Sequence, residues 1–256
     1  KKQAEGTAFD IKKFDMEALV KTANQSDMFL FHGSIPSIPD DAGKEITFLL
    51  LIERLRQILD LIKVPKVMWF LDRVWLEKAR TFFSLYGFVD MIFVNDATWL
   101  KRFESDKISV LRTAAPEEVP EGKFRKELAC DIAFIGDIYT TRKEWFEFIK
   151  KRFGDNFKVF REKYGQEYAD IVKSAKIIIA PEYPYDDFYW SDRIYNVLRH
   201  GGFLMHQRAY GLEAEGFIEK EHYIEYQTEQ DELASIVMFS DKRADLSQSG
   251  DVCPQV

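Results

Sequence analysis

Tyr189-Trp-Ser-Asp-Arg-Ile-Tyr-Asn-Val-Leu-Arg-His-Gly-Gly-Phe-Leu-Met205 is the stretch of sequence that decides the fold, because it predicts a short helix, a glycine turn and a buried strand. Ile194, Val197 and Leu198 lie at positions i, i+3 and i+4, so they can share one buried helix face. The glycine pair at 201–202 then permits positive φ and the close approach of another backbone or a phosphate. Junctions of this kind bind nucleotides in α/β folds, although a plain helix C-cap before a core strand explains the same residues.

Strand patterns alternate with helical patterns in the first half of the chain, which predicts a parallel sheet. The predicted strands are Asp27–Gly33, Lys66–Asp72 and Asp90–Asp96, with helices at about 14–23, 46–62 and 76–86. Ligands of such sheets bind beyond the carboxyl ends of the strands. The polar residues that follow these strands are His32, Asp72, Arg73, Asn95 and Asp96.

A second alternation follows a segment that is rich in proline, glycine and acids and has little to bury. Its predicted strands are 131–135, 158–160, 176–180, 203–205 and 223–226, with helices at 142–153, 166–174, 191–200 and 229–239. The predicted fold class is therefore α/β, with two Rossmann-like domains facing across a cleft. We assign the domains to 1–115 and 127–240, the linker to 116–126 and a tail to 241–256. A single large α/β unit is the alternative at this length of 256 residues.

Composition and charge exclude several classes of protein. The net charge is −7 and the Lys and Arg residues are scattered, which argues against nucleic-acid binding. Cys130 and Cys253 are the only cysteines and predict neither a disulfide framework nor a metal site. No apolar run is long enough to cross a membrane, and the N-terminal residues contain no export signal, so we expect a cytoplasmic protein.

Two loops carry candidate binding groups. In Phe134-Ile-Gly-Asp-Ile-Tyr-Thr-Thr-Arg-Lys143, a glycine loop and a basic helix start follow a strand, which suits a diphosphate. A single glycine after a strand is common, however, and an Arg in a first helical turn is usually solvated. The loop 181–190 is crowded with aromatic rings and acids, which suit bases, sugar rings and hydroxyls, or else pack on their own domain. Ser191 and Asp192 also fit the N-cap of the following helix.

The order of these motifs resembles the C-terminal domain of GT-B glycosyltransferases, and most of all the spore-maturation-protein CgeB-like group of group 1 related enzymes. The resemblance covers about 110 residues from Asp131 to the Leu233 region. The motifs that carry it are Asp131-Ile-Ala-Phe-Ile-Gly-Asp with Arg142, Tyr164-Gly and Tyr168, Ser174-Ala-Lys-Ile-Ile-Ile-Ala, Ser191-Asp-Arg-Ile-Tyr-Asn-Val-Leu-Arg-His-Gly-Gly202, Glu213 with Phe217, Tyr226, and Glu232-Leu. The first half resembles the acceptor domain of these enzymes in its rhythm of strands and helices.

The resemblance implies a glycosyltransferase whose second half holds a nucleotide-sugar donor, with UDP- or GDP-linked sugars as the expected donors. Gly136 and Arg142 would approach the diphosphate, Ser191 and Arg193 would contact phosphate or ribose, and Gly201 and Gly202 would leave room for the nucleotide. The family pattern Ser-x-Arg-x-x-Glu ends here in Asn196, which lacks the two-oxygen acceptor of a carboxylate.

Chemistry at this site needs a stabilised leaving diphosphate and a base that activates the acceptor hydroxyl of a glycan, protein or small molecule. Arg142 and Arg193 can stabilise the diphosphate, and no Asp-x-Asp motif or His/Cys cluster is present, so we expect a metal-independent reaction without a cofactor. His32 and Asp72 are the candidates for the base, although each also has a structural explanation. His200 and His206 are interpreted as packing or solvent residues.

Two other functions stay open. Asn196 favours a degenerate, non-catalytic nucleotide- or sugar-binding subunit, and the two-lobed plan is also that of periplasmic binding proteins, although the sequence has no export signal.

Overall fold

In the computed structural model, the described residues are 15–33, 42–71, 85–95, 97, 105–138, 143–182 and 188–227, and for 32–33 and 42–51 only the backbone is described. The chain divides into two compact units, Lys1–Arg112 and Thr113–Val256. Most of the helix predicted at 76–86, and all of the helix at 229–239 and the tail at 241–256, lie outside the described residues.

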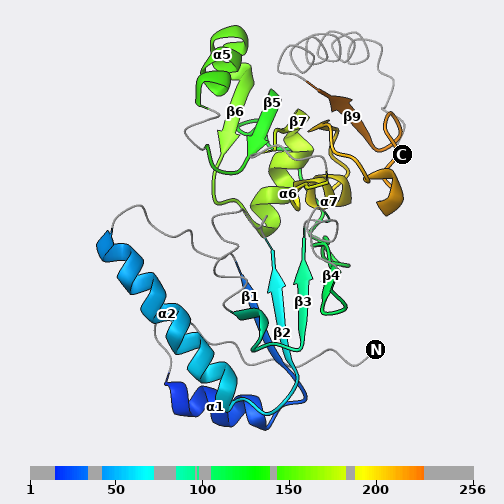
Figure 1. The fold of residues 1–256 in the computed structure, drawn as a ribbon. Helices are drawn as coiled ribbons and strands as arrows, with labels where there is room; N and C mark the ends of the chain where they lie inside the picture. Colours follow the sequence, from blue (N-terminus) through cyan, green and yellow to red (C-terminus); the bar gives the residue numbers. More distant parts are fainter. Residues whose placement is uncertain are drawn as a thin grey trace. The chain divides into compact units, whose positions relative to one another are not determined.

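The first unit contains a four-stranded parallel sheet in the order β1-β2-β3-β4 (Figure 1). Asp15 accepts a hydrogen bond from the backbone N–H of Glu17 and so caps the first helix. The elements are α1 (Met16–Asn24), β1 (Phe29–Gly33), α2 (Ala42–Leu61), β2 (Lys66–Phe70), β3 (Met91–Val94) and β4 (Ile108–Val110). The last of these strands was not predicted from the sequence.

Buried side chains of α2 and the sheet form the core of the first unit. Leu55 and Leu59 of α2 pack in one cluster with Met68 and Phe70 of β2. On α2, Ile58 instead packs with α1. The helix therefore joins the sheet to the N-terminal helix.

The second unit contains a five-stranded parallel sheet in the order β6-β5-β7-β8-β9. Each strand predicted for this half is present, with ends that differ from the prediction by at most two residues. The elements are β5 (Cys130–Ile135), α5 (Lys143–Phe153), β6 (Phe157–Phe160), α6 (Gly165–Ser174), β7 (Ala175–Ala180), α7 (Arg193–Arg199), β8 (Leu204–Gln207) and β9 (Tyr223–Tyr226). Short 3₁₀ turns lie at Gly154–Asn156 and Glu213–Glu215.

Helices cover both faces of the second sheet. In β7, Ile177 and Ile179 pack in a cluster with α5, while Ile178 and Ala180 pack in a cluster with α6 and α7. This division follows from the alternation of side chains along a strand, and it explains why β7 is apolar over residues 177–180. The sheet is therefore wound on both faces, as in Rossmann-like domains.

The segment predicted as a linker, 116–126, is hydrogen-bonded to the second unit. Asp170 of α6, which is 4% exposed, accepts the backbone N–H of Lys123 at 2.8 Å and Nε of Arg125 at 3.1 Å. Ser174 Oγ accepts the backbone N–H of Arg125 at 2.8 Å. The hydrogen bonds of Lys123, followed by that of Gln166, lower the pKa of Asp170.

Candidate functional site

A cluster of buried polar side chains lies where the strand order of the second sheet reverses. From β5 the chain moves to β6 on one side, and it then crosses to β7 on the other side. In open parallel sheets, ligands bind outside the carboxyl ends of the two strands at such a switch point. Ile135 ends β5, and Ala180 ends β7 two residues before Glu182.

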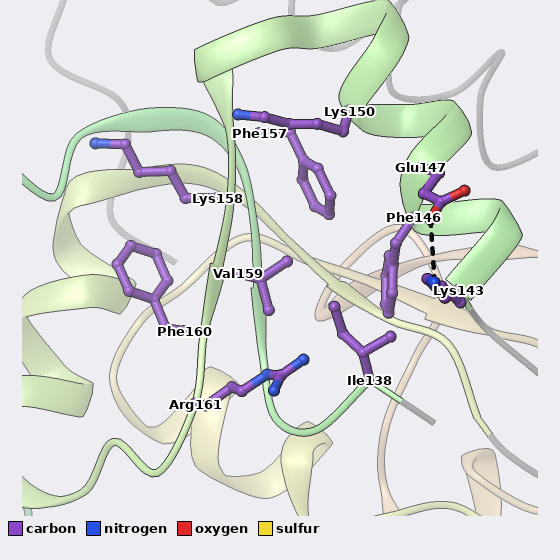
Figure 2. Close-up of a pocket in the computed structure, with 10 residues that line it drawn as sticks. All are labelled: Ile138, Lys143, Phe146, Glu147, Lys150, Phe157, Lys158, Val159, Phe160 and Arg161. Carbon is purple, nitrogen blue, oxygen red and sulfur yellow. Dashed lines mark ion pairs between the residues drawn. The ribbon is translucent and has the colours of Figure 1, made fainter. Parts of the chain in front are cut away.

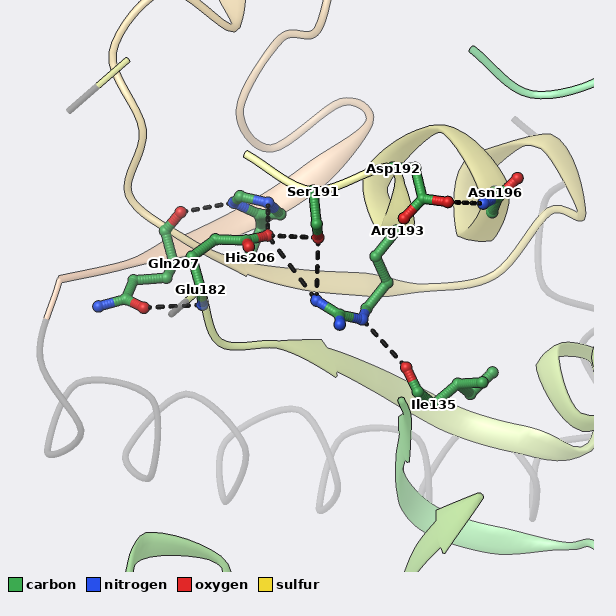
Figure 3. Close-up of polar contacts among 8 residues, drawn as sticks. All are labelled: Ile135, Glu182, Ser191, Asp192, Arg193, Asn196, His206 and Gln207. Atoms are coloured by element: carbon green, nitrogen blue, oxygen red, sulfur yellow. Dashed lines mark hydrogen bonds and ion pairs between the residues drawn. The ribbon is translucent and has the colours of Figure 1, made fainter. Parts of the chain in front are cut away.

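The central cation of the cluster is Arg193, the first residue of α7 (Figure 3). Its Nε donates to the carbonyl of Ile135 at 3.1 Å, and its Nη1 donates to Ser191 Oγ at 3.0 Å. The guanidinium carbon lies 5.0 Å from the ring centroid of Phe134, a cation–π distance. The side chain is only 14% exposed, so the guanidinium is fixed at the end of β5.

Glu182 is the anion of the cluster, and its side chain is 4% exposed. One carboxylate oxygen, Oε1, accepts from Ser191 Oγ at 2.8 Å and lies 3.1 Å from His206 Nε2 and 3.8 Å from Arg193 Nη1. Burial by itself raises the pKa of Glu182, but the contacts with His206, Arg193 and Ser191 outweigh burial and lower it to about 2. Glu182 is therefore a carboxylate at neutral pH.

His206 of β8 is fully buried beside this carboxylate. Its Nδ1 lies 2.5 Å from the carbonyl of Gln207, which can only accept, so Nδ1 carries a proton. No described residue offers Nε2 an aligned hydrogen bond, and its contact with Glu182 is electrostatic. The fixed positive charge of this buried cluster is the Arg193 guanidinium, which suits an anionic ligand.

Gly136 gives a ligand access to Arg193. Its φ of +147° lies in a region that side chains rarely adopt, and a Cβ there would lie 3.2 Å from both Arg193 Nη2 and Phe134 Cζ. The backbone N–H of Gly136 donates to the carbonyl of Phe160 at 2.9 Å. Among the described residues, no hydrogen-bond acceptor engages Nη2. This N–H group therefore faces the glycine loop and is available to a ligand oxygen.

The start of α7 differs from the expected cap. Asp192 occupies the N-cap position without a side-chain capping bond, and the hydroxyl of Ser191 instead joins Glu182 and Arg193. Asn196 Nδ2 donates to Asp192 Oδ2 at 3.1 Å. The amide at position 196 is therefore held one turn along α7 by its own helix.

The glycine turn after α7 has a structural role. Gly201 has φ +70°, and the N–H of Gly202 donates to the carbonyl of Val197. These two features terminate α7. A Cβ on Gly202 would lie 2.5 Å from Val172 Cγ1, so this glycine allows α6 and α7 to pack closely. The turn precedes β8, so it lies at the amino end of that strand, opposite to the polar cluster. Its predicted part in nucleotide binding has no support from these contacts.

Several predicted residues lie outside the described part of the chain. These are Arg142 and Asp72, with Arg73 and Asp96, and for His32 only its backbone in β1 is described. Asn95 is 2% exposed, and its Nδ2 donates to the carbonyl of Leu71 at 3.1 Å, so it ties β3 to the end of β2. In the described ranges, no three His, Cys, Asp or Glu side chains are grouped as a metal site requires. Within the same ranges, no helix has the length and apolarity of a membrane span.

The sequence analysis did not single out Glu182 among the acids of the loop 181–190, and it interpreted His206 as a packing or solvent residue. Both had a signal, because Glu182 comes two residues after the apolar strand Ile177–Ala180 and His206 follows Phe203-Leu-Met205 directly. A polar residue inside or just after a buried strand needs a partner, and here the two residues are partners of each other.

No protein-family model and no curated protein sequence matches the chain significantly. Solved structures do match, however. The structure of Anabaena Alr3699/HepE in complex with UDP-glucose is 10% identical with a TM-score of 0.59, over 90% of this chain and 73% of that chain. The same protein in complex with UDP and glucose is 10% identical with a TM-score of 0.53, over 91% and 81%. An alpha1,3-fucosyltransferase is 9% identical with a TM-score of 0.50, over 88% and 70%. These similarities show the fold, which is of the GT-B type.

Proposed function

We propose that the chain is a glycosyltransferase that moves a sugar from a nucleotide-sugar donor to an acceptor hydroxyl. The observation that carries this proposal is the Arg193 guanidinium, held by Ile135, Ser191 and Glu182 with Nη2 directed to the Gly136 loop. In a GT-B fold, this switch point suits the diphosphate of such a donor. Similar solved structures hold UDP-glucose or UDP with glucose, which favours a UDP-linked sugar over a GDP-linked one.

The chemistry that we propose uses fixed cations in place of solvent. As the glycosidic bond to the diphosphate breaks, negative charge develops on the leaving oxygen, and a guanidinium already in position stabilises that charge without reorganisation. Arg142 remains a proposed second phosphate ligand, and no metal ion is required in this scheme.

The groups that we propose for activating the acceptor belong to the first unit. The proposed candidates for the general base remain His32 and Asp72. His32 is the next-to-last residue of β1 and its backbone pairs with Trp69 of β2, and Asp72 lies two residues beyond β2. The acceptor would be a hydroxyl of a glycan, a protein or a small molecule. Membership in the CgeB-like group and a cytoplasmic location also belong to this proposal.

A second candidate is a non-catalytic subunit that binds a nucleotide or sugar. The observation that favours it is Asn196, whose amide is tied to Asp192 and offers no carboxylate. An enzyme and a binding subunit would both bind nucleotide, so only turnover of a bound sugar distinguishes them.

The test measures thermal stabilisation by UDP, GDP, CMP, dTDP and common UDP- and GDP-sugars. We expect one nucleotide to stabilise the protein, Arg193→Ala to abolish that shift and Arg193→Lys to reduce it. Arg199→Ala is the control, because Arg199 lies on the same helix but donates to the carbonyls of Pro116 and Glu117. Because Arg193→Ala also removes the cation beside Glu182, each shift is measured from the variant's own melting temperature.

The proposed donor site would be contradicted if no compound of the panel stabilised the protein, or if Arg193→Ala gave the same shift as the parent. A chromatographic assay for release of the sugar, or for its transfer to an acceptor, then distinguishes the enzyme from the binding subunit. Binding without any turnover of the sugar would favour the binding subunit.

A further inference from the structure

A cavity of about 800 Å³ lies between α5 and β6 in the second unit (Figure 2). It shares no residue with the polar cluster around Arg193. The volume falls in the range of small-molecule sites, which is roughly 300–1,000 Å³.

The centre of the cavity is apolar. Phe146 of α5 and Phe157 of β6 are 4% and 3% exposed and stack with their ring centroids 5.8 Å apart. Ile138 and Val159 extend toward the same space (Figure 2). A sheet edge beside a helix has thus left a space lined with aromatic and aliphatic side chains, which suits a hydrocarbon chain.

The rim of the cavity is positive. Its lining contains Lys143, Lys150, Lys158 and Arg161 against the single acid Glu147, although the whole chain has a net charge of −7. The pairs Lys143–Glu147 at 3.7 Å and Lys150–Asp155 at 3.2 Å are largely exposed. Exposed pairs contribute roughly 0–1 kcal/mol, so these lysines can turn to a ligand at little cost.

Arg161 is the cation with the most freedom. The described residues offer it neither a hydrogen bond nor an ion pair, and its guanidinium is directed toward Val159 and Ile138 (Figure 2). A guanidinium binds a phosphate through two parallel N–H···O bonds, which a lysine cannot do. An anion held by Arg161 would therefore lie at the boundary between the cationic rim and the apolar centre.

We propose that this cavity binds an amphiphile with one hydrocarbon chain and a phosphate monoester. The chain would lie between Phe146, Phe157 and Val159, and the phosphate would meet Arg161 and Lys150. A phosphate monoester has a charge of about −1.5 to −2 at neutral pH, so it matches several cations better than a carboxylate does. This site is additional to the proposed donor site.

The test is calorimetric titration of the full chain with dodecyl phosphate below its micelle-forming concentration. We expect saturable binding of one dodecyl phosphate, at least tenfold weaker binding of dodecanoate and dodecanol, and no binding of inorganic phosphate. Equal affinities for dodecyl phosphate and dodecanol, or no heat of binding from dodecyl phosphate, would overturn the proposal. Saturating UDP should leave the affinity unchanged, and displacement by UDP would overturn the claim of a separate site.

Variants locate the binding. Arg161→Ala should weaken dodecyl phosphate at least tenfold while dodecanol is unaffected. Lys150→Ala should weaken it severalfold, whereas Lys151→Ala, the next residue on α5 but not part of the lining, should bind like the parent. Val159→Asp should abolish binding, with circular dichroism and melting temperature as checks on folding. Parent-like affinity in Arg161→Ala would overturn the assignment, and so would equal losses in the two lysine variants.

Discussion

Replacing Glu182 by Gln should destabilise the second unit, because it removes the buried anion that contacts Arg193 and His206. The Gln side chain keeps the shape of Glu and can still accept the Ser191 hydroxyl, which Glu182 accepts at 2.8 Å. It has no charge for Arg193 and His206, which lie 3.8 and 3.1 Å from the carboxylate oxygen. The buried guanidinium of Arg193 would then lack its anionic partner.

Two estimates of the cost agree. A carboxyl whose pKa falls from 4.5 to about 2 on folding stabilises the folded state by about 3 kcal/mol at neutral pH. Removing one partner of a buried ion pair costs about 3–5 kcal/mol in measured cases. We expect a loss of about 3 kcal/mol in the free energy of unfolding, which for a unit of this size lowers its melting temperature by roughly 6–12 °C.

The contribution of Glu182 to the free energy of unfolding should depend on pH. Because folding lowers the pKa of Glu182, its contribution is complete above pH 4.5 and is lost as the pH falls toward 2. Urea unfolding of the parent and Glu182→Gln should therefore differ at pH 7 and converge as the pH approaches 2. Glu221→Gln, which changes an exposed acid of the same unit, is the control. A difference below about 1 kcal/mol at pH 7, or one that grows with acid, would refute the electrostatic account of the cluster.

Three further changes test other parts of the second unit. Asp170→Asn should lower the unfolding free energy and speed proteolysis within 113–129, and this effect should fade below about pH 3.8 because folding lowers the pKa of Asp170. Gly202→Ala should lower the unfolding free energy by about 1–3 kcal/mol in urea titrations, because its Cβ would overlap Val172; a neutral effect would show that α6 and α7 can separate freely. In a Cys253→Ser background, iodoacetamide should modify Cys130 slowly at pH 8 and rapidly in urea, since burial raises the pKa of this thiol to about 11; fast labelling of the folded chain would contradict its burial.

The sheets were predictable because their signal is local. Apolar runs such as Ile177–Ala180 are buried on both faces, and such runs bounded by polar residues are typical of parallel strands. The strand Ile108–Val110 was missed because three residues are too few to show a period. Its pairing with β3 is a contact between distant residues and leaves no pattern in the sequence.

The candidate site was predictable only in part. Arg193 and Gly136 belong to local motifs, a helix start and a strand–glycine loop, so the sequence pointed to both. Glu182 and His206 indicate a buried polar site only when they are recognised as a pair, and 24 positions separate them in the chain. Gly202 was a predicted site residue, but a glycine required for helix packing and one required for a ligand cannot be distinguished in a sequence.

The wide spacing of the cluster along the chain has a consequence for biosynthesis. Arg193 binds a carbonyl that was made 58 residues earlier, and Glu182 needs both the ring of His206 and the side-chain oxygen of Gln207. These contacts therefore cannot all form on the ribosome until residue 207 has emerged from the exit tunnel. We expect nascent chains stalled before that point to be digested rapidly around Glu182, and longer chains to resist digestion. Equal digestion would show that protection of this region does not require His206 and Gln207.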